Sequence, residues 1–132
     1  MAARILVVDD DPDMRRLLRG VLERVGEVVE AADGAEALRV VREARPRLML
    51  LDVVMPEMSG IAVLQAALEI APDLPVLMLT GEVDVDMAQL ALDSGAKAFI
   101  TKPFDLDRLL GEVERILRPS GKPTARPWRI RR

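Results

Sequence analysis

The sequence of 132 residues contains no cysteine and no histidine. Without cysteine, the chain can form neither a disulfide nor a thiolate metal site, and it has no thiol nucleophile. Without histidine, it has no imidazole for a catalytic triad or a zinc site, and it cannot carry phosphohistidine. Any metal must therefore bind through oxygen ligands, which favours Mg²⁺ or Mn²⁺ over zinc and copper.

Long hydrophobic runs are also absent. No apolar stretch approaches the roughly 18 residues of a membrane-spanning helix. The N-terminus, MAARILVVDDDP, reaches charged residues too early for a signal peptide. We therefore expect a cytoplasmic protein. Half of the residues are apolar and 31% are charged, a composition typical of a globular protein with one core.

Charge is unevenly distributed along the chain. Residues 119–132 hold five of the 19 basic residues and none of the 22 acidic ones, which leaves residues 1–118 with a net charge of −8. An acidic body does not suit the phosphate backbone, so nucleic acid is not an expected partner of this chain alone. We expect residues 1–118 to form the domain and residues 119–132 to be a flexible linker or tail. Docking of Trp128 on an acidic partner, or on the domain itself, is the alternative.

In the stretch ILVVDDDPD at residues 5–13, an apolar run is followed directly by three consecutive aspartates. Adjacent carboxylates repel one another, and the repulsion is stronger beside a buried apolar strand, where the dielectric constant is low. Asp11 followed by Pro12 is typical of a helix start, which accounts for one of the three acids. Asp9 and Asp10 remain, and their proximity suggests a bound cation.

Five short apolar runs alternate with five helical patterns. The runs predict strands at 4–8, 27–31, 47–51, 75–79 and 97–101, and the periodicity predicts helices at about 12–25, 35–44, 60–71, 84–94 and 105–118. The first helix would end at Gly26 and carry on one face Met14, Leu17, Leu18, Val21, Leu22 and Val25. This alternation predicts an α/β fold: a flavodoxin-like, doubly wound (βα)₅ sheet with strand order 2-1-3-4-5.

Polar residues follow four of the five predicted strands. Asp9 and Asp10 end the first strand, Asp52 the third, Thr80 the fourth, and Lys102 the fifth. Ligands in such folds bind at the carboxyl ends of the strands. Three carboxylates suit Mg²⁺, and an aspartate in that site is a candidate nucleophile toward phosphorus. The charge of Lys102 and the hydroxyl of Thr80 would stabilise the moving phosphoryl group, whose donor must come from elsewhere.

The chain resembles the receiver domain of two-component response regulators over about residues 3–118, in the segments ILVVDD (5–10), LLDVVMPEMSG (50–60), LMLTG (77–81) and GAKAFITKPF (95–104). The resemblance implies the fold of the chemotaxis regulators. It implies that Asp52 accepts phosphate from a histidine kinase or phosphotransfer protein. It also implies that Asp10, Asp52 and the backbone carbonyl of Val54 bind Mg²⁺, with Mn²⁺ a possible substitute. Asp9 would act directly or through water.

The resemblance further implies a conformational switch. Lys102 would pair with the phosphoryl group, Thr80 would move toward it, and Phe99 would turn inward behind it. This motion would reshape the face formed by residues 84–94, 97–101 and 105–118, which would control a downstream partner or output domain or form a homodimer. The Lys102–Pro103 bond resembles a peptide bond that is cis in the family.

Two positions depart from the family's pattern. The aromatic switch residue is often tyrosine, whereas Phe99 has no hydroxyl. Val54 and Glu82 occupy the two positions that tune the attack of water on phosphoaspartate, and the branched, apolar Val54 predicts a slow attack.

Several alternatives stay open at this point. A fixed core role for Phe99 is the alternative to the switch role, since aromatic side chains in strands are usually core. The apolar helix at 84–94 is either well buried or a partner surface. A Mg²⁺-dependent phosphohydrolase is a rival function, although Val54 stands where such enzymes need a second aspartate. A receiver-like binding module without phosphoryl chemistry is the other rival.

Overall fold

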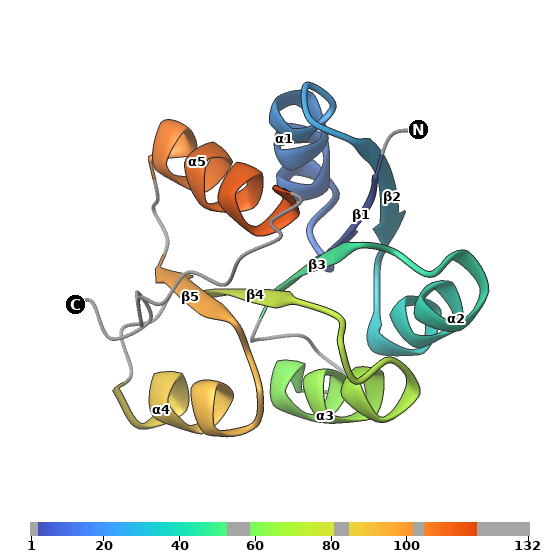
Figure 1. The fold of residues 1–132 in the computed structure, drawn as a ribbon, viewed down its shortest axis with the longest axis vertical. Helices are drawn as coiled ribbons and strands as arrows, with labels where there is room; N and C mark the ends of the chain where they lie inside the picture. The colour runs from blue at the N-terminus through green and yellow to red at the C-terminus, as the bar shows by residue number, and fades with distance from the viewer. Residues whose placement is uncertain (1–2, 53–58, 81–84, 102–104, 119–132) are drawn as a thin grey trace.

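The computed structural model describes residues 3–52, 59–80, 85–101 and 105–118 (Figure 1). At its centre is a five-stranded parallel sheet in the order β2-β1-β3-β4-β5. The strands are β1 (Arg4–Val8), β2 (Glu27–Ala31), β3 (Leu48–Asp52), β4 (Val76–Thr80) and β5 (Ala98–Thr101). The order confirms the predicted flavodoxin-like, doubly wound (βα)₅ fold.

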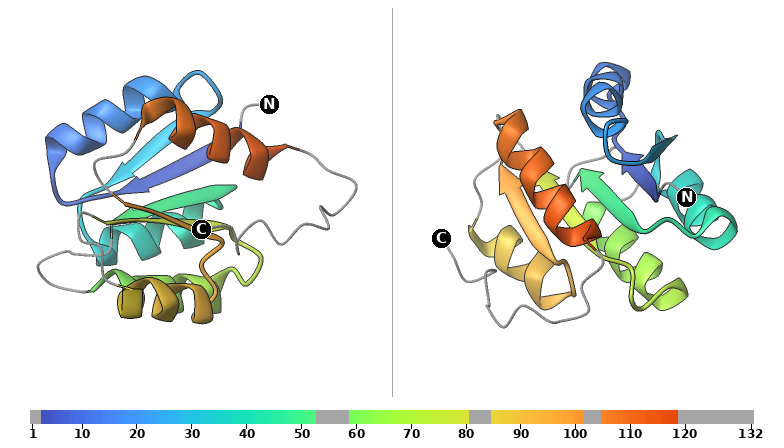
Figure 2. Two further views of the ribbon diagram at one scale, coloured as in Figure 1. Left: turned by 90° about the vertical axis from the view of Figure 1, so that its left-hand side faces the viewer. Right: turned by 45° about the horizontal axis from the view of Figure 1, so that its top comes forward.

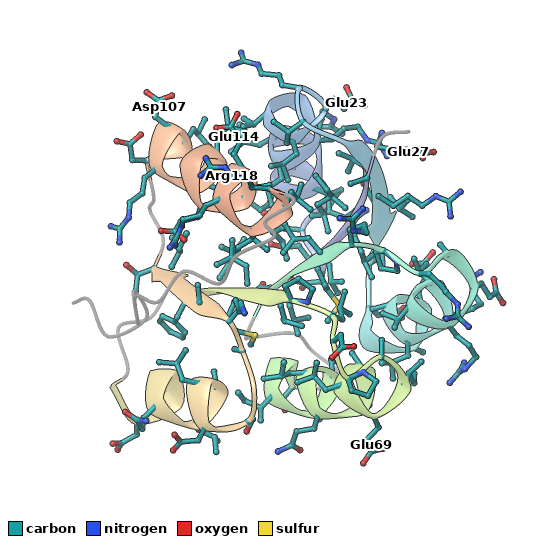
Figure 3. The ribbon with its side chains drawn as sticks, in the orientation of Figure 1. Glu23, Glu27, Glu69, Asp107, Glu114 and Arg118 are labelled. Atoms are coloured by element: carbon teal, nitrogen blue, oxygen red, sulfur yellow. The ribbon has the colours of Figure 1, made fainter. Side chains whose placement is uncertain are left out.

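Five helices connect the strands and cover both faces of the sheet. They are α1 (Pro12–Leu22), α2 (Gly34–Ala44), α3 (Gly60–Ile70), α4 (Val85–Asp93) and α5 (Leu106–Leu117). Helices α1 and α5 lie on one face, and α2, α3 and α4 lie on the other (Figures 1 and 2). Exposed acidic side chains such as Glu69 on α3 and Asp107 on α5 point away from the sheet (Figure 3).

The core has two halves because successive strand residues point to opposite faces. Ile5 and Val7 of β1 pack with buried residues of α1 and α5. Leu6 and Val8 pack with buried residues of α2, α3 and α4. Burial on both faces explains why these strands are continuous apolar runs. It also makes the sheet a rigid support for whatever lies at its edge, because full burial of one such side chain stabilises the fold by about 1.5–3 kcal/mol.

Helix starts agree with the sequence signals. The side chains of Asp11, Asp33 and Ser59 accept hydrogen bonds from the backbone N–H groups of Asp13, Glu36 and Ala62. These N-caps satisfy donors that a helix start otherwise leaves without partners.

The first helix differs from the prediction in two ways: it ends earlier, and one residue of its predicted apolar face is exposed. It ends at Leu22 rather than Val25, because the N–H groups of Val25 and Gly26 both bond to the Leu22 carbonyl, at 2.9 and 3.1 Å, and turn the chain into β2. Leu17 is 45% exposed, whereas Leu18 and Leu22 are fully buried. Each residue advances about 100° around a helix, so Leu17 is turned from the buried side.

Candidate functional site

The turn between β1 and α1 holds the run of aspartates in an ordered arrangement. The N–H of Asp9 donates to the Ala31 carbonyl at 3.2 Å, which continues the pairing of β1 with β2 by one residue. The Asp9 carboxylate accepts from the N–H of Asp11 at 2.9 Å, and the Asp11 carboxylate accepts from the N–H of Asp13 at 2.9 Å. Asp11 is therefore the helix cap that the sequence predicts, and its carboxylate is used there.

Asp52 is the last residue of β3, whose other residues are all buried. Strand β3 is the direct neighbour of β1, with Val8 opposite Leu51. The residues that follow this pair, Asp9 and Asp52, therefore lie side by side at the carboxyl ends of the two strands. Asp9 is only 2% exposed and Asp52 7%, so both carboxylates lie against the apolar end of the sheet.

Carboxylate oxygens of Asp9, Asp10 and Asp52 all lie within 4.8 Å of one another. Asp10 is the exposed member of this acidic cluster. Two unit charges about 5 Å apart repel by about 3 kcal/mol at an effective dielectric constant of about 20. Three such charges at a sheet edge favour a divalent cation, and a set of carboxylate oxygens with one side open to water fits Mg²⁺ or Mn²⁺. The residues present therefore fit the metal that the sequence predicts.

A charged network borders the acidic cluster, and the sequence alone did not reveal it. Arg15 of α1 donates from Nη1 to the Asp9 carbonyl at 2.7 Å and from Nε to Glu30 Oε1 at 3.0 Å. Arg19 donates to the other oxygen of Glu30 at 2.6 Å and to Glu23 at 3.0 Å. The sequence shows that Arg15 and Arg19 are one helical turn apart and that Glu30 lies inside a strand, but only the packing of α1 on β2 brings the three together.

The arginines change the ionisation of Glu30. The hydrogen bond from Arg19, followed by that from Arg15, holds the pKa of Glu30 below its usual value, and partial burial opposes this shift. In return, the hydrogen bonds from Arg19 to Glu30 and Glu23 raise the pKa of Arg19. These opposite shifts both favour the charged forms of Arg19 and Glu30, so their ion pair is intact at neutral pH.

Thr80 and Phe99 belong to the two strands on the far side of β3. Thr80 is the last residue of β4 and pairs in register with Thr101 of β5. Phe99 lies opposite Met78 and is half-buried against the core on the side of α2, α3 and α4. Thr80 thus ends its strand at the carboxyl edge of the sheet, and Phe99 lies two residues before the end of β5.

The remaining predicted site residues lie outside the described part of the chain. These are Val54, Lys102 and Pro103, together with Glu82 and the tail at 119–132. The proposed cis bond between Lys102 and Pro103, the carbonyl ligand at Val54 and the role of Trp128 therefore stay predictions. So does the boundary between residues 118 and 119.

A family model for the response regulator receiver domain matches residues 5–114. The chain belongs to this family. The match includes the acidic cluster, the Arg15–Glu30 network and the strands that carry Thr80 and Phe99. The resemblance noted in the sequence is thereby confirmed, and with it a place in two-component signalling.

Relatives of this receiver domain agree in fold and in family. Response regulator MprA of Mycobacterium ulcerans is 42% identical over 119 residues, which are 89% of this chain and 51% of that protein. The chain thus spans about half the length of the curated relatives it matches. The structure of chemotaxis protein CheY4 of Vibrio cholerae is 35% identical, with a TM-score of 0.82 over 89% of this chain and 100% of that one.

A further solved structure is described as a BeF3-activated DrrB receiver domain. It is 31% identical to this receiver domain, with a TM-score of 0.83 over 89% of this chain and 98% of that one. Within the described residues, none of the helices has the length and apolar character needed to cross a membrane. The cytoplasmic location expected from the sequence stays a prediction.

Proposed function

We propose that this receiver domain accepts a phosphoryl group on Asp52, in a Mg²⁺-dependent reaction, from a partner histidine kinase or phosphotransfer protein. The observation that carries the proposal is the convergence of the Asp9, Asp10 and Asp52 carboxylates within 4.8 Å, in a chain of this family. The product stays on the protein, so the chain is a signalling phosphoacceptor rather than an enzyme with a released product.

Asp10, Asp52 and the backbone carbonyl of Val54 would hold the Mg²⁺ ion, with Asp9 bound directly or through water. When bound, Mg²⁺ offsets the charge of the carboxylates and of the transferred phosphoryl oxygens. Asp9 suits an auxiliary part because one of its oxygens already accepts the N–H of Asp11. Mn²⁺, which also prefers oxygen ligands, is the expected substitute.

Asp52 supplies the nucleophile. One of its carboxylate oxygens forms the new bond to phosphorus while the bond between phosphorus and the donor's imidazole nitrogen breaks, and that nitrogen keeps the electron pair. The buried end of β3 fixes the position of Asp52, and phosphoryl transfer depends mostly on such positioning and on charge stabilisation. Lys102 would pair with the transferred group, and the Thr80 hydroxyl would donate a hydrogen bond to it.

The signal would leave the site through β4 and β5. Thr80 and Thr101 pair in register, and Phe99 lies two residues earlier on β5. A shift of Thr80 toward the phosphoryl group, followed by Phe99, would change the face formed by α4, β5 and α5. Leu90 of α4 is 47% exposed, which suits a surface that contacts a downstream partner, an output domain or a second copy.

The direct test is the intact mass of the protein after incubation with a small acyl phosphate. We expect a Mg²⁺-dependent gain of one phosphoryl group in the wild type and no gain in Asp52→Asn. Asp11→Asn is the matched control, because asparagine caps a helix as well as aspartate does. Asp11 belongs to the same run but its carboxylate serves the helix, so this variant should react like the wild type.

Absence of an adduct would have two readings that a second probe separates. Beryllofluoride mimics a phosphoryl group on aspartate without being hydrolysed. If the wild type binds Mg²⁺ and beryllofluoride but shows no adduct, hydrolysis is faster than the assay. If it binds Mg²⁺ and not beryllofluoride, the chain is a binding module and the proposal is wrong.

A further inference from the structure

Arg15 joins three parts of the molecule. It stands on α1, its Nε donates to Glu30 of β2, and its Nη1 donates to the backbone carbonyl of Asp9 in the acidic turn. Its side chain is only 17% exposed, against 74% for the neighbouring Arg16. Arg15 is therefore held in one place, whereas Arg16 extends along the surface.

The carbonyl that Arg15 contacts controls the geometry of the acidic cluster. It belongs to the peptide group that links Asp9 to Asp10, and a peptide group is planar. The same Asp9 is fixed at its N–H by the Ala31 carbonyl and at its carboxylate by the N–H of Asp11. With its carbonyl fixed as well, the direction in which the chain enters Asp10, the exposed member of the cluster, is determined.

Glu30 determines where the Arg15 guanidinium can go. One Glu30 oxygen accepts from Arg15 at 3.0 Å and the other from Arg19 at 2.6 Å. Guanidinium groups bind carboxylates strongly, and two carboxylates of the cluster, those of Asp9 and Asp10, belong to the same turn as the carbonyl that Arg15 contacts. An arginine freed from Glu30 would turn toward those carboxylates and would oppose a bound cation.

We propose that Arg15 is a positioning residue for the cation site, and that Glu30 holds its guanidinium on the Asp9 carbonyl and away from the carboxylates. The inference rests on the proposed Mg²⁺ site. The Arg15–Glu30 pair carries no net charge, so it orients the turn without adding a cation that competes with Mg²⁺. Because the hydrogen bonds from Arg19 and Arg15 lower the pKa of Glu30, its carboxylate stays ionised further into acid than an ordinary glutamate does.

The test is calorimetric titration of Mg²⁺ into the full chain, for the wild type and three variants. Groups that orient metal ligands change affinity by about 10–100-fold when mutated, so we expect Arg15→Gln and Glu30→Gln to raise the Mg²⁺ dissociation constant by about tenfold. Arg19→Gln is the matched control. It removes a hydrogen bond to the same Glu30, but its other partner is Glu23, and we expect its dissociation constant to equal that of the wild type.

The double variant Arg15→Gln/Glu30→Gln separates positioning from general damage. If Glu30 acts through Arg15, its replacement adds nothing once Arg15 is gone, so the two effects are not additive. Additive losses would overturn the inference. Should Arg15→Gln fail to fold, Arg15→Lys takes its place. Lysine keeps the charge but lacks the fork that binds both partners, and weaker Mg²⁺ binding is again expected.

The outcomes distinguish this inference from the proposed function. A wild type that binds no Mg²⁺ would overturn the proposed site and the inference together. A wild type that binds Mg²⁺, with Arg15→Gln unchanged, would overturn the inference alone and leave the proposed function standing. Unfolding of each variant by urea in the presence of a chelator shows whether a change in affinity follows only from a loss of fold.

Discussion

Val54 is the residue at which the lifetime of phosphorylated Asp52 is expected to be set. A branched, apolar side chain two residues after the proposed nucleophile would hinder the approach of water, whereas an amide would hold water by hydrogen bonds. We therefore predict that Val54→Asn shortens the half-life of the phosphoryl group several-fold. The measurement is the decay of the phosphorylated mass after removal of the donor.

The matched control for this prediction is Val54→Ile, which keeps a branched apolar side chain and should leave the half-life unchanged. Both variants should still gain the phosphoryl group, because the proposed acceptor is Asp52. If Val54→Asn loses phosphate no faster than the wild type, Val54 does not restrict water.

Gly95 occupies a backbone conformation that other residues avoid. Its φ is +112°, and a Cβ built there would lie 2.6 Å from Cδ1 of Leu68. Replacement by alanine strains the backbone and displaces a side chain of α3, so we predict that Gly95→Ala lowers the free energy of unfolding by about 1–3 kcal/mol. Urea unfolding measures the change.

Gly111, in an ordinary helical position, gives the opposite expectation. It lies inside α5, and a Cβ there meets nothing within 4 Å. Alanine is favoured over glycine within a helix by about 0.5–1 kcal/mol, so Gly111→Ala should raise the free energy of unfolding. A loss at Gly111, or no loss at Gly95, would contradict this account of the two glycines.

At the scale of elements, the contact between α1 and β2 depends on pH through Glu30. Hydrogen bonds from Arg19 and Arg15 lower the pKa of Glu30 in the folded chain. The stability that Glu30 contributes is therefore complete above about pH 4.3, the usual pKa of a glutamate, and is lost as the pH falls through the lower folded value. We predict that Glu30→Gln is less stable than the wild type at pH 6 and that the difference shrinks in acid.

The measurement is the free energy of unfolding in urea, with a chelator present, at pH 6 and at a series of lower pH values through and below about pH 4.3. Glu27→Gln is the control on the same strand. Glu27 pairs with Arg4 at 3.5 Å and its side chain is 59% exposed, so its loss should change stability little at pH 6. A difference between Glu30→Gln and the wild type that stays constant or grows in acid would contradict the prediction.

At the scale of the whole molecule, the elements that the sequence predicts are those with local signals. The apolar run before Asp52 predicts strand β3, and Asp11 predicts the start of α1. Both signals lie within a few residues of the element that they predict. The meeting of Asp9 and Asp52 was also predictable, because strand order follows from the alternation of strands and helices. The contact of Arg15 with Glu30 was not, since it depends on how α1 lies across β2. The exposure of Leu17 depends likewise on where α1 meets its neighbours.

The stability of the whole domain should report the cation site as well. The proposed Mg²⁺ ion binds the folded chain, so a concentration of about 100 times its dissociation constant would raise the free energy of unfolding by about 2.7 kcal/mol. Asp10→Asn removes one of three converging charges. We predict that this variant is more stable than the wild type in a chelator but gains much less from Mg²⁺, so that the order of the two proteins reverses.

A reversed order of stability between the wild type and Asp10→Asn would distinguish a specific cation site from general binding of cations to an acidic surface. On an acidic surface, Mg²⁺ would screen charges generally, and Asp10→Asn and Asp11→Asn would respond alike. At a site formed by the cluster, Asp11→Asn should keep the wild-type gain, because the Asp11 carboxylate accepts from the N–H of Asp13. The measurement is urea unfolding of the three proteins with and without Mg²⁺. Equal gains in all three would show that no ion is held by Asp10.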